Sequence, residues 1–407
     1  MKILHVNYSE SGGGAAIAAN RLHKALLKSG VDSKILVCEM TSDDTTIIGP
    51  ETKIQKLISL AKPTIDQFPI KNYINKSKTM FSTAWYGSRS IIKKINEINP
   101  DIVHFHWINN GMIKIEHISK INAPIVWSLH DMWAFTGGCH YDEHCELYKK
   151  ECGNCKVLGS TKESDLSQKI FKIKLKSYHN ITVNGLSSWI AESAKKSTLF
   201  HHMKIVNIPN LIDTKTYKCL DAKICRKLYN LPLYKKIITF GAMNSTSDPR
   251  KGYNLLTEAL SKVNRDDTEC VIFGGANMNY EDALPMKVHS IGNKKDDESI
   301  VALYNASDVI VVPSLQENLS NVIMESLACG TPVVAFNIGG NSDMIKHKVN
   351  GYLVKPFETA DLANGIKWVL EHSKYNQLSA SARKTIEENF SEKFIVEEYT
   401  QLYKQVL

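Results

Sequence analysis

The chain has 407 residues, of which 43% are hydrophobic and 23% charged, and its formal net charge is +8 at pH 7. This length is large for one core and favours two domains, and the composition is that of a globular protein. The charge is modest for the length and gives no reason to expect a nucleic-acid partner, and no apolar run is long enough to span a bilayer.

Nine cysteines, an odd number, argue against a fully paired disulfide scaffold. The opening sequence MKILHVNYSESGGG is typical of a buried first strand, and its apolar part is too short for a secretory signal. We therefore expect a cytoplasmic protein with reduced thiols.

The first elements alternate between strand and helix. They are a strand, a glycine-rich loop, a helix and a second strand, predicted at Lys2–Asn7, Ser11–Gly14, Ala15–Ser29 and Ser33–Cys38. Gly13 and Gly14 let the backbone approach a ligand closely, and the helix start that follows them offers N–H groups to a phosphate. The loop does not match a dinucleotide fingerprint, because Ile17 stands where a third glycine or an alanine is needed.

The stretch between Lys53 and Lys94 is basic and interleaved with apolar residues. Its cations are Lys53, Lys56, Lys62, Lys71, Lys76, Lys78, Arg89, Lys93 and Lys94. This composition suits an amphipathic surface that rests on anionic lipid, where each well-placed cation contributes about 1 kcal/mol. The alternative is a solvated helical face, which is what a run of charge commonly means.

Histidines mark the ends of the next strands. The predicted elements are a strand, a helical stretch and a strand, at Asp101–Phe105, Ile113–Ile121 and Ile125–Leu129. A histidine at the carboxyl end of a parallel strand faces the ligand crevice, whereas one within a strand is more often a core residue with satisfied nitrogens. His130 therefore ranks above His106, and His106 above His104, as a candidate site residue.

A short loop directly after His130 contains four cysteines, at Cys139, Cys145, Cys152 and Cys155. The last two have the C-x2-C spacing of a tetrahedral zinc site, whereas the first two do not. Structural zinc is one interpretation, and two redox-labile disulfides or unligated thiols are the others. Because the loop follows His130, we expect it to shape the acceptor side of the site.

Adjacent cations follow the first strand of the second half of the chain. The elements around them are helices predicted at Ser167–His179 and Asn254–Val263 and strands predicted at Ile181–Gly185, Lys204–Ile208, Lys236–Gly241 and Val271–Gly275. In the loop after Gly241, Arg250 and Lys251 suit a diphosphate and would stabilise the charge that develops as it leaves. The alternative is an exposed basic pair near a hinge.

Two glutamates, with seven residues between them, lie beside a predicted helix start. Glu317 is in the loop after the apolar strand Val309–Val312, and Glu325 is on the helix Asn321–Cys329. Two carboxylates suit a ligand with two sets of hydroxyls, a ribose and a sugar, while the free N–H groups of residues 319–322 hold its phosphate. The spacing therefore predicts a sugar nucleotide, and the alternative is a pair of solvated side chains.

Glu317-x7-Glu325, the sequence CGTPVV at 329–334 and the Gly339-Gly340 turn resemble the donor-site signature of retaining glycosyltransferases of family 4. The resemblance implies the α/β GT-B fold, with two doubly wound Rossmann-like domains that face a cleft and a C-terminal helix that crosses back to the first domain. We expect the domains at residues 1–208 and 209–388 and the crossing segment at 389–407. The resemblance also implies a nucleotide-diphosphate sugar donor, retention of configuration and no metal for catalysis.

The residue chemistry given above and this resemblance together assign roles to residues. Those expected to be catalytic are His130, Arg250, Lys251 and Glu317. Those expected to bind the donor are Gly13, Gly14, Arg250, Lys251, Glu317, Asn318, Leu319, Ser320, Asn321 and Glu325. Two positions depart from the family pattern, because Ala242 replaces an arginine and Leu211 replaces the glycine of an Asn-Gly hinge.

The function that this resemblance implies is transfer of a sugar to a glycan or lipid-linked glycan acceptor, in the biosynthesis of a bacterial surface polysaccharide such as lipopolysaccharide. The basic stretch is compatible with peripheral contact at the inner face of the cell membrane. Two alternatives remain open from the sequence: a catalytically silent GT-B partner that binds a sugar nucleotide, and a GT-B phosphorylase or epimerase.

Overall fold

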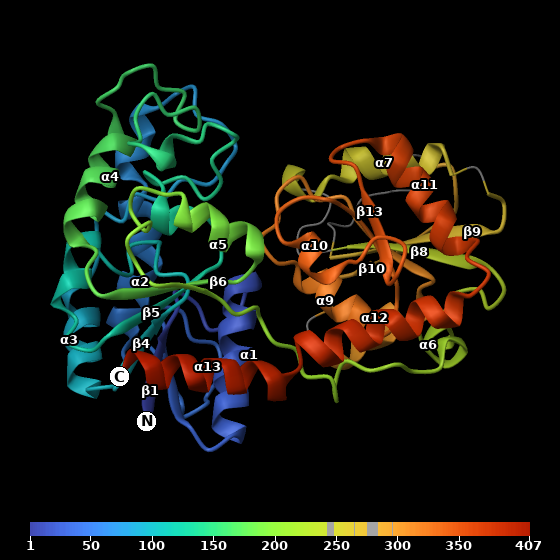
Figure 1. Cartoon of the computed structure of the whole chain (residues 1–407), viewed down its shortest axis with the longest axis horizontal. Coiled ribbons are helices and arrows are strands. Elements are labelled where there is room, and N and C mark those ends of the chain that lie inside the picture. The colour runs from blue at the N-terminus through green and yellow to red at the C-terminus, as the bar shows by residue number, and fades with distance from the viewer. Residues whose placement is uncertain (242–247, 264, 275–283, 295) are drawn as a thin grey trace. The chain divides into compact units, whose positions relative to one another are not determined.

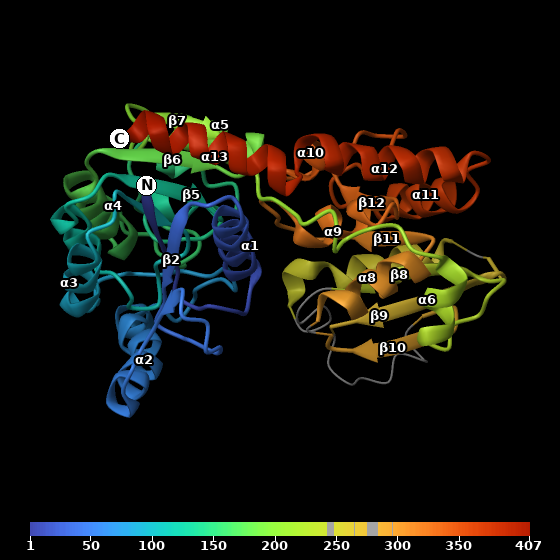
Figure 2. The same ribbon diagram turned by 90° about the horizontal axis from the view of Figure 1, so that it is seen from below.

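The computed structural model describes residues 1–241, 248–263, 265–274, 284–294 and 296–407, and the chain divides into two compact units (Figure 1, Figure 2). The first unit comprises Met1–Asn210 and Val396–Leu407, and the second comprises Leu211–Ile395. Each unit has its own parallel sheet and its own buried apolar core.

The first unit is built on a parallel sheet whose strands run in the order β3-β2-β1-β4-β5-β6-β7. The strands are β1 (Lys2–Val6), β2 (Asp32–Leu36), β3 (Ile47–Ile48), β4 (Ile102–Phe105), β5 (Ile125–Leu129), β6 (Ile181–Gly185) and β7 (Ile205–Asn207). The helices are α1 (Gly14–Lys28), α2 (Lys53–Asp66), α3 (Arg89–Ile98), α4 (Leu166–Ser177) and α5 (Ser188–Lys195), with 3-10 turns η1 (Phe68–Asn72), η2 (Ile115–Lys120), η3 (Trp133–Phe135) and η4 (Leu147–Lys149). The order reverses between β1 and β4, where open α/β sheets bind their ligands.

The second unit repeats this plan with the strand order β10-β9-β8-β11-β12-β13. Its strands are β8 (Lys236–Gly241), β9 (Thr268–Phe273), β10 (Val288–Gly292), β11 (Val309–Val312), β12 (Val333–Phe336) and β13 (Gly351–Val354). Its helices are α6 (Ala222–Leu228), α7 (Tyr253–Ser261), α8 (Asp297–Ala306), α9 (Asn321–Ala328), α10 (Asn341–Met344), α11 (Thr359–Leu370) and α12 (Tyr375–Asn389), with the 3-10 turn η5 (Pro249–Lys251). Here the order reverses between β8 and β11.

These two parallel sheets confirm the α/β fold class predicted from the sequence. The helical stretch expected at Ile113–Ile121 is the short 3-10 helix η2 and not an α-helix. Its buried residues Ile115 and Ile118 are three apart, and side chains at that spacing lie above one another in a 3-10 helix. None of the helices in the described ranges is long and apolar enough to cross a membrane.

The C-terminal helix α13 (Glu392–Val406) contributes two buried tyrosines to the core of the first unit. The hydroxyl of Tyr403 bonds to Nδ1 of His104 at 2.7 Å, and Nε2 of His104 bonds to the hydroxyl of Ser128 at 2.8 Å. Nδ2 of Asn184 donates to the hydroxyl of Tyr399 at 2.9 Å. This polar layer ties the helix to β4, β5 and β6, as the predicted crossing helix requires.

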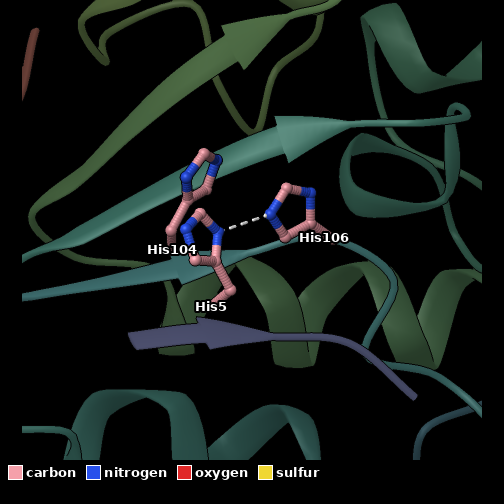
Figure 3. A group of neighbouring side chains, drawn as sticks. All are labelled: His5, His104 and His106. Atoms are coloured by element: carbon pink, nitrogen blue, oxygen red, sulfur yellow. Dashed lines mark hydrogen bonds between the residues drawn. The ribbon is translucent and has the colours of Figure 1, made fainter. Parts of the chain in front are cut away.

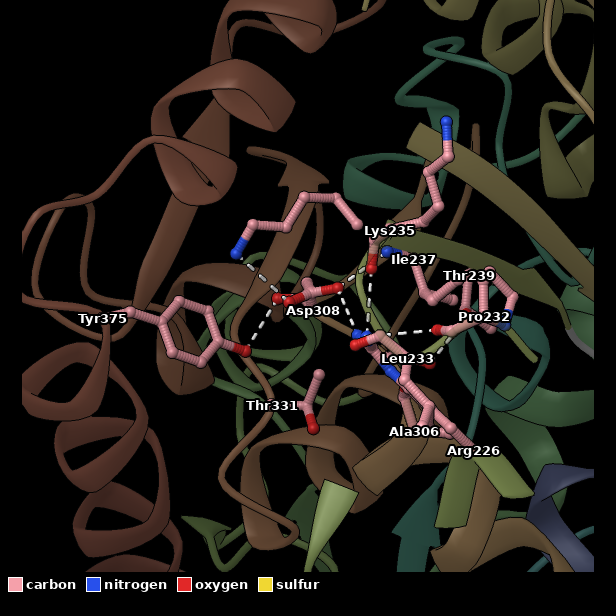
Figure 4. A network of polar contacts seen from close by, with 12 residues as sticks. Arg226, Pro232, Leu233, Lys235, Ile237, Thr239, Ala306, Asp308, Thr331 and Tyr375 are labelled. Atoms are coloured by element: carbon pink, nitrogen blue, oxygen red, sulfur yellow. Dashed lines mark hydrogen bonds and ion pairs between the residues drawn. The ribbon is translucent and has the colours of Figure 1, made fainter. Parts of the chain in front are cut away.

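A buried ion pair joins α6 to the amino ends of β8 and β11 in the second unit (Figure 4). The guanidinium of Arg226 lies 2.6 Å from a carboxylate oxygen of Asp308, which also accepts the backbone N–H of Ile237 at 2.6 Å. Nε of Arg226 donates to the carbonyl of Ala306. The pair is at the opposite end of the strands from the predicted ligand site, so we interpret it as structural.

Candidate functional site

Lys251 and Glu317 form an ion pair at the carboxyl end of β11. Nζ of Lys251 lies 2.8 Å from Oε1 of Glu317, and the two side chains are 25% and 13% exposed. A partly exposed pair at this edge of a parallel sheet is accessible to a ligand. The structure thus brings together two residues that the sequence analysis selected separately.

Two glycines allow the backbone to pack closely around this pair. Gly252 has φ +72°, and a Cβ atom there would lie 1.8 Å from the carbonyl oxygen of Pro313. Gly339 has φ +52°, and a Cβ atom there would lie 1.7 Å from the carbonyl oxygen of Glu317. Since neither distance is possible for a real side chain, only glycine fits at these positions. The N–H of Gly340 also donates to the carbonyl of Asn318 at 2.8 Å.

Arg250 does not lie beside Lys251 as a free cation. Its Nε and Nη2 atoms bond to both carboxylate oxygens of Asp248 at 2.7–3.2 Å, and its side chain is 41% exposed. Burial raises the pKa of the Asp248 carboxyl, but the hydrogen bonds from Arg250 outweigh that effect and leave the pKa below its usual value. Ala242, the position of the arginine expected from the family pattern, lies outside the described residues.

Glu325 is buried on α9, where its Oε2 atom accepts a hydrogen bond from the hydroxyl of Tyr304 at 2.9 Å. Tyr304 comes from α8 and is itself fully buried, which raises the pKa of its hydroxyl well above the usual value. The sequence analysis missed Tyr304. No local pattern pointed to it, because the sequence does not show which carboxylate a tyrosine meets.

The amino end of α9 offers backbone N–H groups for an anion. Its N-cap residue, Ser320, makes no capping hydrogen bond through its side chain. Asn318, Leu319 and Ser320 are buried, and Asn321 begins the helix. The first N–H groups of a helix have no partner within it, and the helix dipole favours negative charge at this end.

The glycine loop of the first unit precedes α1. Gly12 and Gly13 have φ +92° and +89°, and Gly14 is the first residue of the helix. No atom of the described residues lies within 4 Å of a Cβ built on Gly12 or Gly13. The positive φ angles therefore explain these glycines, and the space beside them is open to a ligand.

His130 follows β5, and its Nε2 atom bonds to Nδ1 of His106 at 3.1 Å. His106 bonds in turn through Nε2 to Nδ1 of His5 on β1 at 3.0 Å (Figure 3). Burial lowers the pKa of His130 to about 4 and keeps the ring neutral at neutral pH. His104 is a core residue bonded to α13, and the sequence analysis missed His5.

Asp131 is fixed by the residues around it. It accepts hydrogen bonds from Nδ1 of His140 at 2.6 Å, from Nε1 of Trp107 at 3.1 Å and from the N–H of Trp133 at 2.8 Å. The hydrogen bonds of the described residues do not join Asp131 to its neighbour His130. Asp131 therefore acts on His130 only through its charge, which favours the protonated ring.

The four cysteines of the 139–155 loop all carry free thiols, and Cys139, Cys152 and Cys155 are buried. Burial raises the pKa of Cys152 to about 12 and that of Cys155 to about 11. In the described part of the chain, the potential metal ligands that gather within 4.8 Å of one another are three imidazoles, and these sulfur atoms do not form such a group. Zinc in this loop stays a prediction, which the zinc content of protein purified under reducing conditions would test.

Residues 235–385, which contain the ion pair and both glutamates, match the model of a family described as glycosyl transferases group 1. An uncharacterized glycosyltransferase of Methanocaldococcus jannaschii is 32% identical over 322 residues, which cover 75% of each chain. A protein of Escherichia coli K12 that is named as a colanic acid biosynthesis glycosyl transferase, WcaC, is 22% identical, with all of both chains covered. The solved structure of HepE from Anabaena in complex with UDP-glucose matches with a TM-score of 0.67 at 18% identity over 100% of both chains, a likeness that concerns the fold.

Proposed function

The chain belongs to the group 1 glycosyl transferases and has the GT-B fold, and from this membership we propose that it transfers a sugar from a nucleotide-diphosphate sugar to a hydroxyl of a glycan or lipid-linked glycan. Two relatives support the finer parts of this proposal. HepE is described in complex with UDP-glucose, and WcaC is named for the biosynthesis of a polysaccharide. We therefore infer a role in making a surface polysaccharide.

The observation that carries the proposal is the Lys251–Glu317 pair beside the uncapped start of α9. The ammonium group and the helix N–H groups supply positive charge for a diphosphate. Glu317 and Glu325 supply acceptors for the hydroxyls of the sugar and the ribose. A site that only bound phosphate would gain nothing from two carboxylates.

In the proposed reaction, the bond between the anomeric carbon and the diphosphate oxygen breaks, and the acceptor oxygen bonds to that carbon on the same face. The acceptor's proton passes to the departing phosphate oxygen, so configuration is retained without a protein nucleophile. Lys251 and the amino end of α9 stabilise the charge on the diphosphate, and positioning supplies much of the remaining rate enhancement. From the first unit, we assign Gly13, Gly14 and His130 to ligand binding.

Incubation with a panel of nucleotide sugars and glycan acceptors tests this proposal. The donor should raise the melting temperature by mass action and should yield a new glycosidic bond whose anomeric configuration matches that of the donor, as read by NMR. We expect activity to persist in EDTA, because cations of the chain fill the role of a metal. Inversion of the product, or release of free sugar in place of transfer, would contradict the assigned reaction.

An exposed apolar and basic surface on α2 and the turn after it supports a further part of the proposal, contact with anionic lipid. We call it the α2 patch. Its apolar members are Ile54, Leu57, Leu60, Phe68 and Ile74, which are 63–93% exposed. Lys53, Lys56, Lys71, Lys76 and Lys78 are exposed among them, and Asp66, the one acid between residues 52 and 80, is buried.

Side chains this apolar are rarely left in water over a contiguous stretch unless they meet a partner. Figure 2 shows α2 projecting from the rest of the first unit, and the helix buries Ser59, Lys62 and Asp66 while the apolar members of the patch are exposed. Apolar residues that enter a lipid interface and lysines that meet anionic headgroups act together in membrane binding. We therefore propose that the protein works at the cytoplasmic face of a membrane on a lipid-linked acceptor.

Sedimentation with phospholipid vesicles tests the α2 patch. Vesicles that contain anionic lipid should bind the protein, and high salt should weaken the binding. Leu57→Ser with Leu60→Ser should abolish it, whereas Leu228→Ser, at an exposed leucine on α6 of the second unit, should have little effect. Equal binding of the wild-type protein and the double variant would remove this part of the proposal and leave the transfer reaction untouched.

A further inference from the structure

His5, His106 and His130 form a continuous row of hydrogen-bonded imidazoles in the first unit. The row runs from β1, through the residue after β4, to the residue after β5. Its two links measure 3.0 Å between His5 and His106 and 3.1 Å between His106 and His130. His5 and His106 are 0% and 5% exposed, so both rings are shielded from bulk solvent.

The same region gathers the nitrogens of His5, His104 and His106 within 4.8 Å, but its geometry does not suit a metal ion (Figure 3). The rings of His104 and His106 lie face to face, with centroids 4.4 Å apart and planes 26° apart. Because imidazole binds a metal through a lone pair in the plane of its ring, stacked rings do not point at one ion. Both nitrogens of His104 also have partners, in Tyr403 and Ser128.

Proton counting limits the row to two arrangements. Burial lowers the pKa of each of the three histidines, so each ring is neutral and carries one N–H. In one arrangement, each ring carries its proton on Nδ1 and donates toward His130. In the other, each carries it on Nε2 and donates toward His5.

The far end of the row distinguishes these arrangements. Nε2 of His5 is buried and has no hydrogen-bond partner among the described residues. If the protons were on Nε2, an N–H group would be buried there without an acceptor, which is among the rarest features of native structures. With the protons on Nδ1, the unpartnered atom is only a lone pair.

We propose that His5 and His106 are positioning residues that hold His130 in its Nδ1–H tautomer. None of the hydrogen bonds in the described part of the chain uses Nδ1 of His130, so the row leaves that N–H available as a neutral donor. The last step alone rests on the proposed function: in the bound complex, this N–H donates to an oxygen of the sugar or its phosphate. Asp131, the charged neighbour of His130, favours a proton on the ring, and burial opposes a second one.

Nitrogen-15 NMR of histidine-labelled protein at pH 7.5 tests the tautomers directly. The N–H nitrogen and the lone-pair nitrogen of a neutral imidazole give separate signals, and the variants His5→Phe, His106→Asn and His130→Asn assign them. We expect N–H signals from Nδ1 of all three rings and a lone-pair signal from Nε2 of His5. A proton on Nε2 of His130, or a doubly protonated ring, would overturn the proposal. This measurement needs no donor or acceptor, so it stands even if the proposed reaction fails.

Activity gives a second readout. His106→Asn should make both tautomers of His130 visible and lower kcat by roughly tenfold, with KM for the donor nearly unchanged, as is typical when the partner of a functional histidine is lost. His117→Asn is the matched control. His117, on η2, is also buried in the first unit, and none of the hydrogen bonds or ring contacts of the described residues joins it to the row. An equal loss of kcat in both variants, with the tautomer of His130 unchanged, would show that the row is merely structural.

Discussion

Replacement of Lys251 by alanine is the perturbation that separates ligand binding from structure most clearly. In the structure, its ammonium group lies 2.8 Å from Glu317, and both side chains remain partly exposed. The variant removes one cation and leaves the backbone of η5 in place, because the bond from the N–H of Leu315 to the carbonyl of Arg250 involves no side chain.

The expected loss follows from the contact that the lysine makes with a diphosphate. A hydrogen bond to a charged group contributes about 1.5–3 kcal/mol, and about 1.4 kcal/mol corresponds to a tenfold change in rate, so kcat/KM should fall by roughly 10- to 150-fold. The loss of the ion pair with Glu317 should cost the fold only about 1 kcal/mol or less, since a partly exposed pair is weak. Activity should therefore fall far more than stability.

The assay is the initial rate of transfer at varied donor concentration, combined with urea denaturation of the same preparations. Lys355→Ala is the control, because that lysine is 74% exposed and its carboxylate partner is 3.8 Å away. If Glu317 also contacts the sugar, Lys251→Ala and Glu317→Ala together should cost more than either alone. A change in kcat/KM of less than about threefold in Lys251→Ala would refute the assigned role, since it amounts to well under 1 kcal/mol.

Three further predictions concern other residues. Tyr304→Phe removes the hydroxyl that bonds to Glu325. It should raise KM for the donor roughly fivefold with kcat nearly unchanged, because about 1 kcal/mol of hydrogen bonding is lost. Kinetics at varied donor concentration would check this, and an unchanged KM would contradict it. Asp308→Asn leaves the guanidinium of Arg226 buried without its counter-charge and should lower the free energy of unfolding by about 3–5 kcal/mol, as measured in urea. Burial lowers the pKa of His104 to about 3, against an ordinary value near 6.5, so between these values only the unfolded chain binds the proton. The free energy of unfolding should therefore be constant above pH 6.5 and should fall below it by about 1.4 kcal/mol per pH unit for this residue, and a flat profile between pH 6.5 and 4 would contradict that account.

The strands and the donor-side glutamates could be predicted from the sequence, because each depends on a local sequence pattern. Val309–Val312 and Val333–Phe336 are continuous apolar runs, and the structure has buried parallel strands with the same bounds. Glu317 and Lys251 were selected for their places after strands, and parallel strands bring such places together at one edge of a sheet. The sequence analysis selected the two residues separately, and their pairing at 2.8 Å is a finding of the structure.

Contacts between side chains that are distant in the sequence could not be predicted. Tyr403 bonds to His104 across 299 positions, and His5 bonds to His106 across 101. No local period connects such residues, because sheet register and helix docking decide which side chains meet. Arg250 shows a different limit: a cation beside an acid in the same loop can serve a ligand or its neighbour, and here it bonds to Asp248.

Gly339 connects the signature read from the sequence with the site seen in the structure. A Cβ atom at Gly339 would lie 1.7 Å from the carbonyl oxygen of Glu317, whereas at Gly12, which also has a positive φ, the space for a Cβ atom is open. Alanine at Gly12 therefore meets only an unfavourable backbone conformation, but alanine at Gly339 must also displace the chain at Glu317. The glycine turn and the first glutamate belong to one motif because they are in backbone contact, although 22 positions separate them. A larger residue at Gly339 would consequently move the carboxylate of Glu317 without touching its side chain.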